Sequence, residues 1–426
     1  MVEATAGDLD GDGIADIIIQ TGAAADGAGQ VTVLAGSTAR DFSDAGSGTH
    51  QWTGAAEGDD LGGKPGLLPG DMDGDGVEDL VLVAPGADAG AGTVYLLSSA
   101  ASSGDVGTAA TWSWTGPDST AALGDLAVLG DIDADGAADV LVSAPFYDGG
   151  GRDRGIVYVL SSGSVGVSRD PADGIAIAGE SNYHKLGQSP VNAGDMDGDG
   201  VDEILLGASG VTALAQADGR VYRIPATDLA DTAFSLTDAD RYTGESRVSR
   251  LGGRNHAIGD FNGDGHADIL VNSDHQIPGY ASGTAYLLHG ASSLSADTNV
   301  GDAHARIAND MSSITFAGNG DWGNGVALGD LNGDGAEDLA IADPGADLSR
   351  AYGNDGLVAV YLGGSLSGDH GTAASADVLL HGISQYGAWP VVAGGDVDAD
   401  GFDDIWVGYW ATTSLDLYFL PGSLIP

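Results

Sequence analysis

The sequence predicts an all-β fold, a seven-bladed β-propeller that spans residues 1–426 as a single domain. An Asp-rich motif first seen at residues 8–16 recurs six times at steps of 60 to 70 residues, and a long period of this kind indicates an array of like units. A short apolar run follows each copy, as expected of a strand buried on both faces. Seven units leave about 61 residues each, which suits a four-stranded blade.

The Asp-rich motif is expected to bind calcium, one ion per loop and about seven in all. Each copy has side-chain oxygens at loop positions 1, 3, 5 and 9, and a glycine at position 6 where a side chain would obstruct the turn. Calcium accepts about six to eight oxygen ligands in irregular geometry, whereas magnesium keeps several waters. With the carbonyl of position 7, the expected ligands are Asp8, Asp10, Asp12, Ile14, Asp16, Asp71, Asp73, Asp75, Val77, Asp79, Asp131, Asp133, Asp135, Ala137, Asp139, Asp195, Asp197, Asp199, Val201, Glu203, Asp260, Asn262, Asp264, His266, Asp268, Asp330, Asn332, Asp334, Ala336, Asp338, Asp396, Asp398, Asp400, Phe402 and Asp404. The neutral Asn262 and Asn332 should make their two sites the weakest.

Two other interpretations of the motif must be compared with this one. An EF-hand begins in the same way but requires a bidentate glutamate at position 12 and flanking helices. Position 12 is apolar in all seven copies: Ile19, Leu82, Val142, Leu206, Val271, Ile341 and Val407. Plain Asp-Gly turns on an acidic surface are the other alternative, because both residues are common in turns. A turn, however, does not need the acidic ninth position that every copy has.

Composition restricts the partners. The formal net charge is −49, from 63 acidic and 14 basic residues, and seven Ca²⁺ ions would offset only part of it. Nucleic acid and direct membrane insertion are therefore not expected, and no apolar run approaches the roughly 18 residues of a membrane span. The chain has no cysteine, which excludes disulfides and a thiol site. Met1 stands almost directly before the first loop, so we expect any secretion signal to lie outside this sequence.

Four strands are expected in each blade. The innermost strand precedes the calcium loop and the second follows it, as at 126–129 and 140–142, so the loop closes a hairpin. The third carries a recurring tyrosine that we expect to pack in the core. The fourth is more polar and ends in glycine, at 50–54, 112–116, 175–179, 241–244, 314–318 and 378–382. The resulting blades are approximately 1–54, 55–116, 117–179, 180–244, 245–318, 319–382 and 383–426.

These features resemble the FG-GAP repeats of the integrin α-subunit propeller, over nearly the whole chain. The aromatic-Gly signature of that family corresponds to Leu61-Gly62, Leu123-Gly124, Leu186-Gly187, Leu251-Gly252, Trp322-Gly323 and Tyr386-Gly387. A calcium loop in all seven blades, rather than in some, suggests a bacterial-type member. The resemblance implies that the calcium hairpins share one face and that partners bind the opposite face. Integrins use aromatics of the signature there, but four of the six positions here are leucine.

The expected function is an extracellular or cell-surface, calcium-stabilised module for binding or adhesion, without catalysis. Its partner would be a protein or a glycan on the face opposite the calcium loops, where the longest insertions are 146–155, 273–283 and 343–356. They carry Phe146, Tyr147, Arg152, Arg154, His275, Tyr280, Arg350 and Tyr352, a mixture of aromatics and arginine that is typical of protein contacts. Ordinary loop packing would explain these residues equally well.

Two alternative functions remain open. A carbohydrate-active hydrolase or lyase on a propeller scaffold would use some of the many carboxylates, although the nine histidines recur in no motif and no serine nucleophile signature is present. A structural spacer in a large surface protein is the other alternative.

The last blade is expected to have only three strands. The first, second and third strands occur seven times in the sequence, but the glycine-terminated fourth occurs six times. Residues 1–7 are needed as the innermost strand of the first blade, and the proline-flanked 421–426 is a poor strand. An open edge at 414–420 invites strand addition, and we expect a strand from residues upstream of Met1 to supply it.

Overall fold

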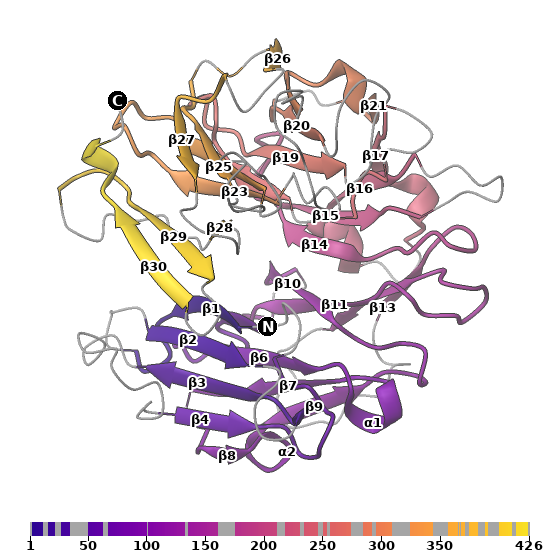
Figure 1. Ribbon diagram of the computed structural model, residues 1–426. Helices are drawn as coiled ribbons and strands as arrows, with labels where there is room; N and C mark the ends of the chain where they lie inside the picture. The colour runs from indigo at the N-terminus through magenta and orange to yellow at the C-terminus, as the bar shows by residue number, and fades with distance from the viewer. Residues whose placement is uncertain are drawn as a thin grey trace. The chain divides into compact units, whose positions relative to one another are not determined.

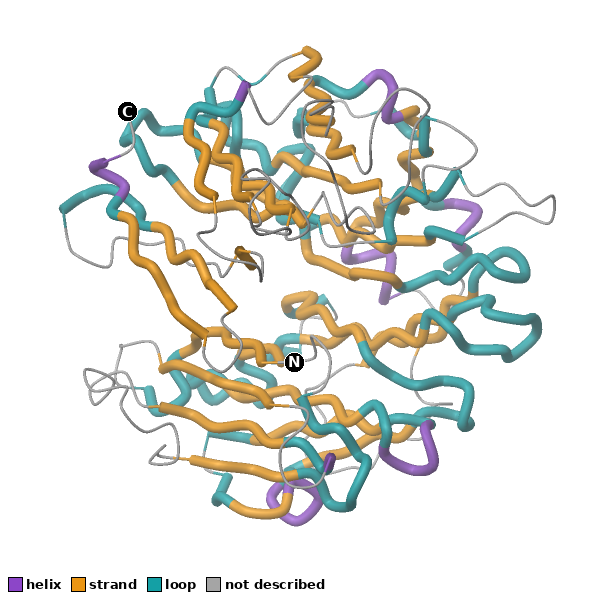
Figure 2. Tube along the Cα trace, viewed as in Figure 1, coloured by secondary structure: helices purple, strands orange, loops and turns teal. Residues whose placement is uncertain are grey.

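A computed structural model of the chain is built almost entirely of antiparallel strands, with a few very short helices (Figure 2). It divides into two compact units, which are described separately: residues 1–192 with 224–238 (unit 1), and residues 193–223 with 239–426 (unit 2). The structure describes residues 2–11, 16–21, 27–34, 50–62, 67–99, 101–132, 135–160, 175–210, 218–230, 234–245, 250–253, 256–273, 284–291, 295–308, 324–343, 357–364, 366, 368–370, 375–381, 388–390, 400–410 and 415–424.

Unit 1 contains three sheets that follow one plan (Figure 1). Their strand orders are β1-β2-β3-β4-β8, β5-β6-β7-β9 and β10-β11-β12-β13. The strand bounds are β1 (Val2–Gly7), β2 (Asp16–Thr21), β3 (Gln30–Leu34), β4 (His50–Thr53), β5 (Leu67–Gly70), β6 (Asp79–Ala84), β7 (Thr93–Leu97), β8 (Gly104–Asp105), β9 (Trp112–Thr115), β10 (Asp125–Gly130), β11 (Asp139–Ala144), β12 (Ile156–Leu160), β13 (Ile175–Ala178) and β14 (Gln188–Asn192). Its helical segments are α1 (Ala87–Gly90), α2 (Val106–Ala109), η4 (Ala226–Ala230) and η5 (Leu236–Asp238).

Unit 2 repeats the plan. Its sheets contain β15-β16-β17-β21, β18-β19-β20-β22-β26, β23-β24-β25-β27 and β28-β29-β30. The bounds are β15 (Glu203–Ala208), β16 (Arg220–Pro225), β17 (Asp240–Thr243), β18 (Ala257–Gly259), β19 (Asp268–Ser273), β20 (Thr284–Leu288), β21 (Asp297–Asn299), β22 (Ala305–Ala308), β23 (Asn324–Gly329), β24 (Asp338–Asp343), β25 (Leu357–Tyr361), β26 (Gly368–His370), β27 (Val378–His381), β28 (Ala388–Pro390), β29 (Ile405–Trp410) and β30 (Leu415–Leu420), with η6 (Val300–Asp302) and η8 (Gly422–Leu424).

The second and third strands of each sheet form the core. Every residue of β6, β11, β15 and β19 is buried, as a strand covered on both faces requires. The recurring tyrosine of the third strand is also buried, with an exposed fraction of 7% or less at Tyr95, Tyr158, Tyr222, Tyr286 and Tyr361. The prediction that this residue packs in the core is confirmed.

The fourth strands β4 and β9 are partly buried, and the third residue of each is the buried one. Another fourth strand was predicted at the wrong place. The strand beside β20 is β22, not the segment 314–318, which lies outside the described residues. Ala305 and Ile307 of β22 are fully buried, while Arg306 between them reaches Glu245, with 3.0 Å from Nη1 to Oε1. Alternation of buried and less buried residues therefore locates this strand better than the glycine that ends the segment 314–318.

Three short strands join the outer edges in a way that the sequence did not predict. β8 pairs in parallel with β4, β21 with β17, and β26 with β22. Each added strand comes from the connection between the third and fourth strands of the next repeat along the chain. An outer edge is thus partly covered by its neighbour, which protects it from pairing with other chains.

Glycines bring consecutive repeats into close contact. Gly29 forms a parallel bridge with Leu61, Gly155 with Leu186, and Gly219 with Leu251. The three glycines have positive φ, and a Cβ on any of them would clash with the backbone of the leucine. The glycine that precedes the third strand is therefore required both by its conformation and by the approach of the next repeat.

The last sheet has the three strands that the sequence predicts, in the order β28-β29-β30. After Leu420 the described residues are 421–424, and they contain the 3-10 helix η8 and no fourth strand. Among the described residues, the outer edge of β30 is not paired.

Core packing gives the first testable prediction. Trp114 is 1% exposed and meets the ring of Tyr158 edge-on at a centroid distance of 4.8 Å. Trp114→Ala should lower the free energy of unfolding by about 3–5 kcal/mol, because it leaves a large cavity. Phe146→Ala, at a ring that is 44% exposed, should change it by less than about 0.5 kcal/mol. Urea denaturation in calcium measures both, and equal effects would contradict the assignment of the core.

Candidate metal centres

The glycine at position 6 has the same backbone conformation in the five central loops. The position 6 glycine has a φ between +87° and +95° at Gly76, Gly136, Gly200, Gly265 and Gly335. A Cβ added to any of them would meet nothing within 4 Å. These glycines are therefore required by the backbone conformation and not by lack of space.

The carboxylate of position 1 organises the turn. In the second loop, Oδ1 of Asp71 accepts the N–H groups of Gly74 and Asp75 at 2.7 and 3.1 Å, and Oδ2 accepts that of Gly76 at 3.0 Å. The carboxylate of position 5 also accepts a backbone hydrogen bond, because Oδ1 of Asp75 accepts the Val77 N–H. The fourth loop makes the same bonds from Asp195 and Asp199.

The ninth position has a structural role that sequence reasoning missed. Asp79 is fully buried; its Oδ2 accepts the Met72 N–H and its Oδ1 the Ser99 N–H, both at 3.0 Å. Met72 is the second residue of the loop, and Ser99 follows the third strand. Asp338 makes the equivalent bonds to Leu331 and Gly363 at 2.8 and 2.7 Å. An acidic ninth residue is therefore needed to join the loop to the sheet, whether or not it also binds a metal.

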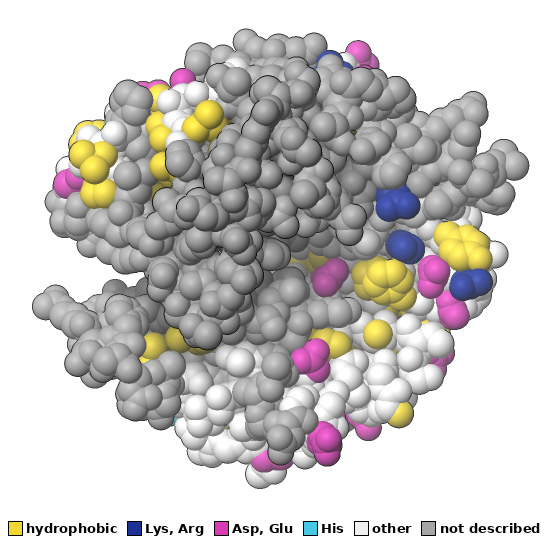
Figure 3. Space-filling view, in the orientation of Figure 1, with side chains coloured by type: hydrophobic (Ala, Val, Ile, Leu, Met, Phe, Trp, Pro, Cys, Tyr) yellow, Lys and Arg dark blue, Asp and Glu magenta, His cyan; other side chains and the backbone are white. Residues whose placement is uncertain are grey.

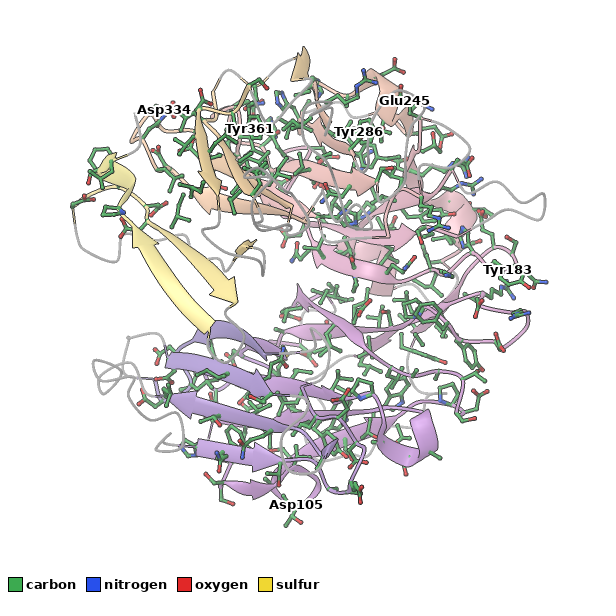
Figure 4. The ribbon with its side chains drawn as sticks, in the orientation of Figure 1. Asp105, Tyr183, Glu245, Tyr286, Asp334 and Tyr361 are labelled. Atoms are coloured by element: carbon green, nitrogen blue, oxygen red, sulfur yellow. The ribbon has the colours of Figure 1, made fainter. Side chains whose placement is uncertain are left out.

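Two loops bring three carboxylates together. Asp71, Asp73 and Asp79 each offer an oxygen within 4.8 Å of the other two, as do Asp195, Asp197 and Asp199. Calcium binds oxygens at about 2.3–2.6 Å, so two ligands of one ion lie at most about 5 Å apart. The donor set of these loops fits a calcium ion. In the fifth and sixth loops, the position 3 amide is oriented by hydrogen bonds to Asp264 and Asp334; Asp334 is labelled in Figure 4.

Other expected ligands are only partly described. Asp131, Asp135, Ala137 and Asp139 of the third loop are described, and Asp131 holds the same turn. Asp8, Asp10 and Asp16 of the first loop and Asp400, Phe402 and Asp404 of the last are also described. The remaining expected ligands lie outside the described residues: Asp12, Ile14, Asp133, Asp396 and Asp398.

Neighbouring loops are hydrogen-bonded to each other within each unit. The position 8 N–H donates to the position 1 carbonyl of the preceding loop, from Ala138 to Asp71 at 2.9 Å and from Glu337 to Asp260 at 2.9 Å. Where position 8 is acidic, its side chain can also accept the position 1 N–H. Glu78 accepts from Asp8 at 2.6 Å, and Asp403 accepts from Asp330 at 2.9 Å.

The family model for the FG-GAP repeat matches residues 3–34, 65–97, 123–160, 253–288 and 322–361. Each matched segment contains one of the Asp-rich loops and the strands on both sides of it. The chain carries FG-GAP repeats of the integrin α type. All of the described sheets are consistent with the all-β fold that such repeats form.

Integrin α subunits are among the curated proteins to which this FG-GAP chain is similar. The chain is 33% identical to human (Homo sapiens) integrin alpha-10 over 127 residues, which are 29% of this chain and 10% of that protein. It is 30% identical to Drosophila melanogaster integrin alpha-PS2 over 179 residues, 40% of this chain and 12% of that protein. The chain thus spans about a tenth of the length of these relatives.

Two solved structures are similar. One is the crystal structure of BBS1N in complex with ARL6DN, with a TM-score of 0.46 and 12% identity over 98% of this chain and 91% of that chain. The other is the V. cholerae biofilm matrix protein Bap1, with a TM-score of 0.32 and 11% identity over 79% and 73%.

The leucines at the aromatic-Gly positions of the FG-GAP signature are buried. Leu61, Leu123, Leu186 and Leu251 are each 0% exposed. They pack between repeats, so these four side chains do not form exposed aromatic sites. Trp322 and Tyr386 lie outside the described residues.

Burial raises the pKa of the ninth-position carboxyls. It raises the pKa of Asp79 to about 6 and that of Asp268 to about 7, against the opposing effect of the backbone N–H bonds. The nearby acidic side chains of the same loop, Asp73 and Asp264 respectively, add to the rise. The loops thus hold carboxylates in a place that disfavours their charge, and a bound cation would reverse this effect.

Removing a ligand and removing a structural contact should have separable effects. Asp73→Asn and Asp79→Asn should both weaken calcium binding at the second loop. In EDTA, Asp73→Asn should change the unfolding free energy by less than about 0.5 kcal/mol. Asp79→Asn should lower it by about 1–3 kcal/mol, because an amide N–H₂ would oppose the Met72 or Ser99 N–H. Chemical denaturation with and without calcium measures the difference, and two variants that are indistinguishable in EDTA would refute the structural role.

The raised pKa values predict an unusual pH dependence without calcium. The folded protein binds more protons than the unfolded chain between about pH 4 and pH 7, so this contribution to stability is present at low pH and is lost as the pH rises to about 7. Calcium competes with these protons and should bind more weakly below about pH 6. Calorimetric melts in EDTA and in calcium should therefore diverge from pH 5 to pH 7.5. A constant gap would contradict the coupling.

Proposed function

We propose that this chain is a non-catalytic, calcium-stabilised module for binding or adhesion, a seven-bladed β-propeller that acts outside the cell. The observation that carries the proposal is the gathering of Asp71, Asp73 and Asp79 in a loop whose pattern recurs seven times. On this proposal all seven loops bind one ion each, and residues 1–426 form one array of blades. Calcium would neutralise the repelling carboxylates only in the folded state, which stabilises that state.

The absence of catalysis is supported by where the carboxylates gather. Both groups of three acids found among the described residues lie in the calcium loops. A hydrolase or lyase would need a pair of acids outside these loops. Because the position 9 acids are also used to hold the sheet, they are poorly placed for reaction with a substrate.

The extracellular location is proposed from the kind of site and from the relatives. Short acidic loops in extracellular modules bind calcium with dissociation constants of about 10⁻⁴–10⁻³ M, which suits fluids outside cells. No helix among the described residues is long and apolar enough to cross a membrane. Integrin α subunits are among the relatives of this chain, and adhesion is carried over from them as part of this proposal.

The partner is proposed to be a protein or a glycan that binds away from the calcium loops. A second contact could form at the outer edge of β30, which is not paired among the described residues. An open edge accepts an added strand through its backbone N–H and C=O groups. Strand addition at this edge is part of the proposal.

Calcium removal tests the proposal as a whole. Thermal unfolding should occur at a much higher temperature in 5 mM calcium than in EDTA, whereas magnesium should raise it little. Titration calorimetry should give about seven equivalents, with the two asparagine loops the weakest. Asn262→Asp should strengthen one of the two. Identical melts in calcium and EDTA would refute calcium stabilisation. Fewer than about five equivalents would refute the proposal of one calcium ion in every blade.

A further inference from the structure

Two exposed aromatic rings and two basic side chains form a patch on unit 1, which we call the aromatic–basic patch: Phe146, Arg152, Tyr183 and Lys185. Phe146 and Tyr183 are 44% and 38% exposed, and they are two of the four large apolar residues that are exposed among the described residues. Apolar and basic side chains stand together at one edge of the surface in Figure 3, with acidic side chains among them, and Tyr183 points outward at the same edge in Figure 4.

The two cations of the patch are paired with rings instead of with acids. Arg152 lies over the Tyr183 ring at 5.5 Å from its centroid, and the Lys185 ammonium lies over the Phe146 ring at 5.0 Å. Among the described residues, no carboxylate lies within 4.0 Å of either cation. Elsewhere in this acidic chain, Arg223 pairs with Asp240, Arg241 with Asp297, and Arg306 with Glu245. The chain has 63 acidic and 14 basic residues, so most basic groups could find an acid to pair with. Because these two do not, their charge is available to an anion from outside the chain.

The backbone holds the patch in place. The Tyr183 N–H donates to the Arg152 carbonyl at 2.6 Å, and the Lys185 N–H donates to the Asp153 carbonyl at 3.0 Å. Asp153, Tyr183 and Lys185 all have positive φ, a conformation that side-chain-bearing residues adopt only where the surroundings impose it. The two loops are thus fixed to each other, and a ligand would not have to order them.

We propose that the aromatic–basic patch binds an anionic polysaccharide, with its acidic groups on Arg152 and Lys185 and its sugar rings against Phe146 and Tyr183. This inference rests on the proposed binding function and names the class of ligand. Guanidinium and ammonium groups bind carboxylate or sulfate oxygens. An aromatic face carries negative charge density that attracts the C–H groups of a sugar ring, and the exposed Asn182 beside Tyr183 offers an amide for hydroxyl groups.

A folded protein fits this patch less well. A stable protein interface covers about 800 Å² on each partner, whereas the two rings expose only about 100 Å² each at their measured fractions. The rest of the molecule is strongly negative, and a broad acidic protein surface would meet that charge. An extended polyanion can place a few groups on the patch, because repulsion beyond about 8 Å is largely screened at physiological salt.

The test uses the calcium-loaded full chain and oligosaccharides that do not gel with calcium. A hyaluronan decasaccharide supplies carboxylates, a heparin oligosaccharide supplies sulfates, and a chitin hexasaccharide is the neutral control. A glutamate decapeptide represents the protein alternative. Binding is measured by titration calorimetry in 0.15 M salt for the wild type, for Arg152→Gln with Lys185→Gln, and for Tyr183→Ser. Arg241→Gln, in the ion pair with Asp297 of unit 2, is the matched control.

The patch is supported if hyaluronan or heparin binds more tightly than chitin, and the double variant weakens that binding by about tenfold or more. Tyr183→Ser should also weaken it, while Arg241→Gln should not. Unchanged melts in calcium would show that the variants are folded. Comparing hyaluronan with heparin identifies carboxylate or sulfate as the group recognised.

Several results would overturn the proposal. Binding of the glutamate peptide alone, lost in the double variant, would assign the patch to a protein. Polysaccharide binding that the double variant leaves unchanged would place the site elsewhere. If no probe binds while calcium still stabilises the fold, the polysaccharide proposal is wrong and the calcium proposal is unaffected. If hyaluronan binds the patch but EDTA has no effect on the melt, calcium stabilisation fails instead.

Discussion

The buried carboxylate at loop position 9 is the contact on which the repeats depend. In Asp79 and Asp338 it accepts the N–H of the second loop residue and an N–H that follows the third strand, so one side chain joins the hairpin to the rest of its sheet. Burial disfavours its charge, and the other acids of the loop add repulsion. The fold therefore carries an electrostatic penalty at the same point that holds it together, and a cation is the simplest relief.

Much of the fold could be predicted from the sequence, because each repeat shows the same pattern of loop and strands again. The loop pattern, the strands after it and the packing of the recurring tyrosine all depend on short-range spacing, which a sequence displays directly. The hydrogen bond from Ser99 to Asp79 could not be predicted, because Ser99 is twenty residues away and its N–H leaves no mark on the sequence. The fourth strand of the fifth repeat shows the same limit. A glycine at the end of a segment predicts this strand at 314–318, but the alternating burial of Ala305, Arg306 and Ile307 marks its true position.

The surface departs from the integrin pattern in a consistent way. At the aromatic-Gly positions of the signature, Leu61 and Leu186 are buried against the glycines of the preceding repeat. The exposed rings instead stand on the loops beside this junction, at Phe146 and Tyr183, each with a cation. The acidic position 8, as in Glu78 and Asp403, was visible in the sequence and could have suggested contacts between loops.

The strands that cross from one repeat to the next have a consequence for how such chains can change. β4, β17 and β22 each complete their outer edge with a segment that belongs to the following repeat. A repeat duplicated or deleted by recombination would carry away the edge of its predecessor and bring an edge that was shaped for another. Repeats are therefore not interchangeable parts, and point substitution within a fixed number of repeats is the easier course for divergence. A repeat cut out alone would expose a bare edge and tend to aggregate.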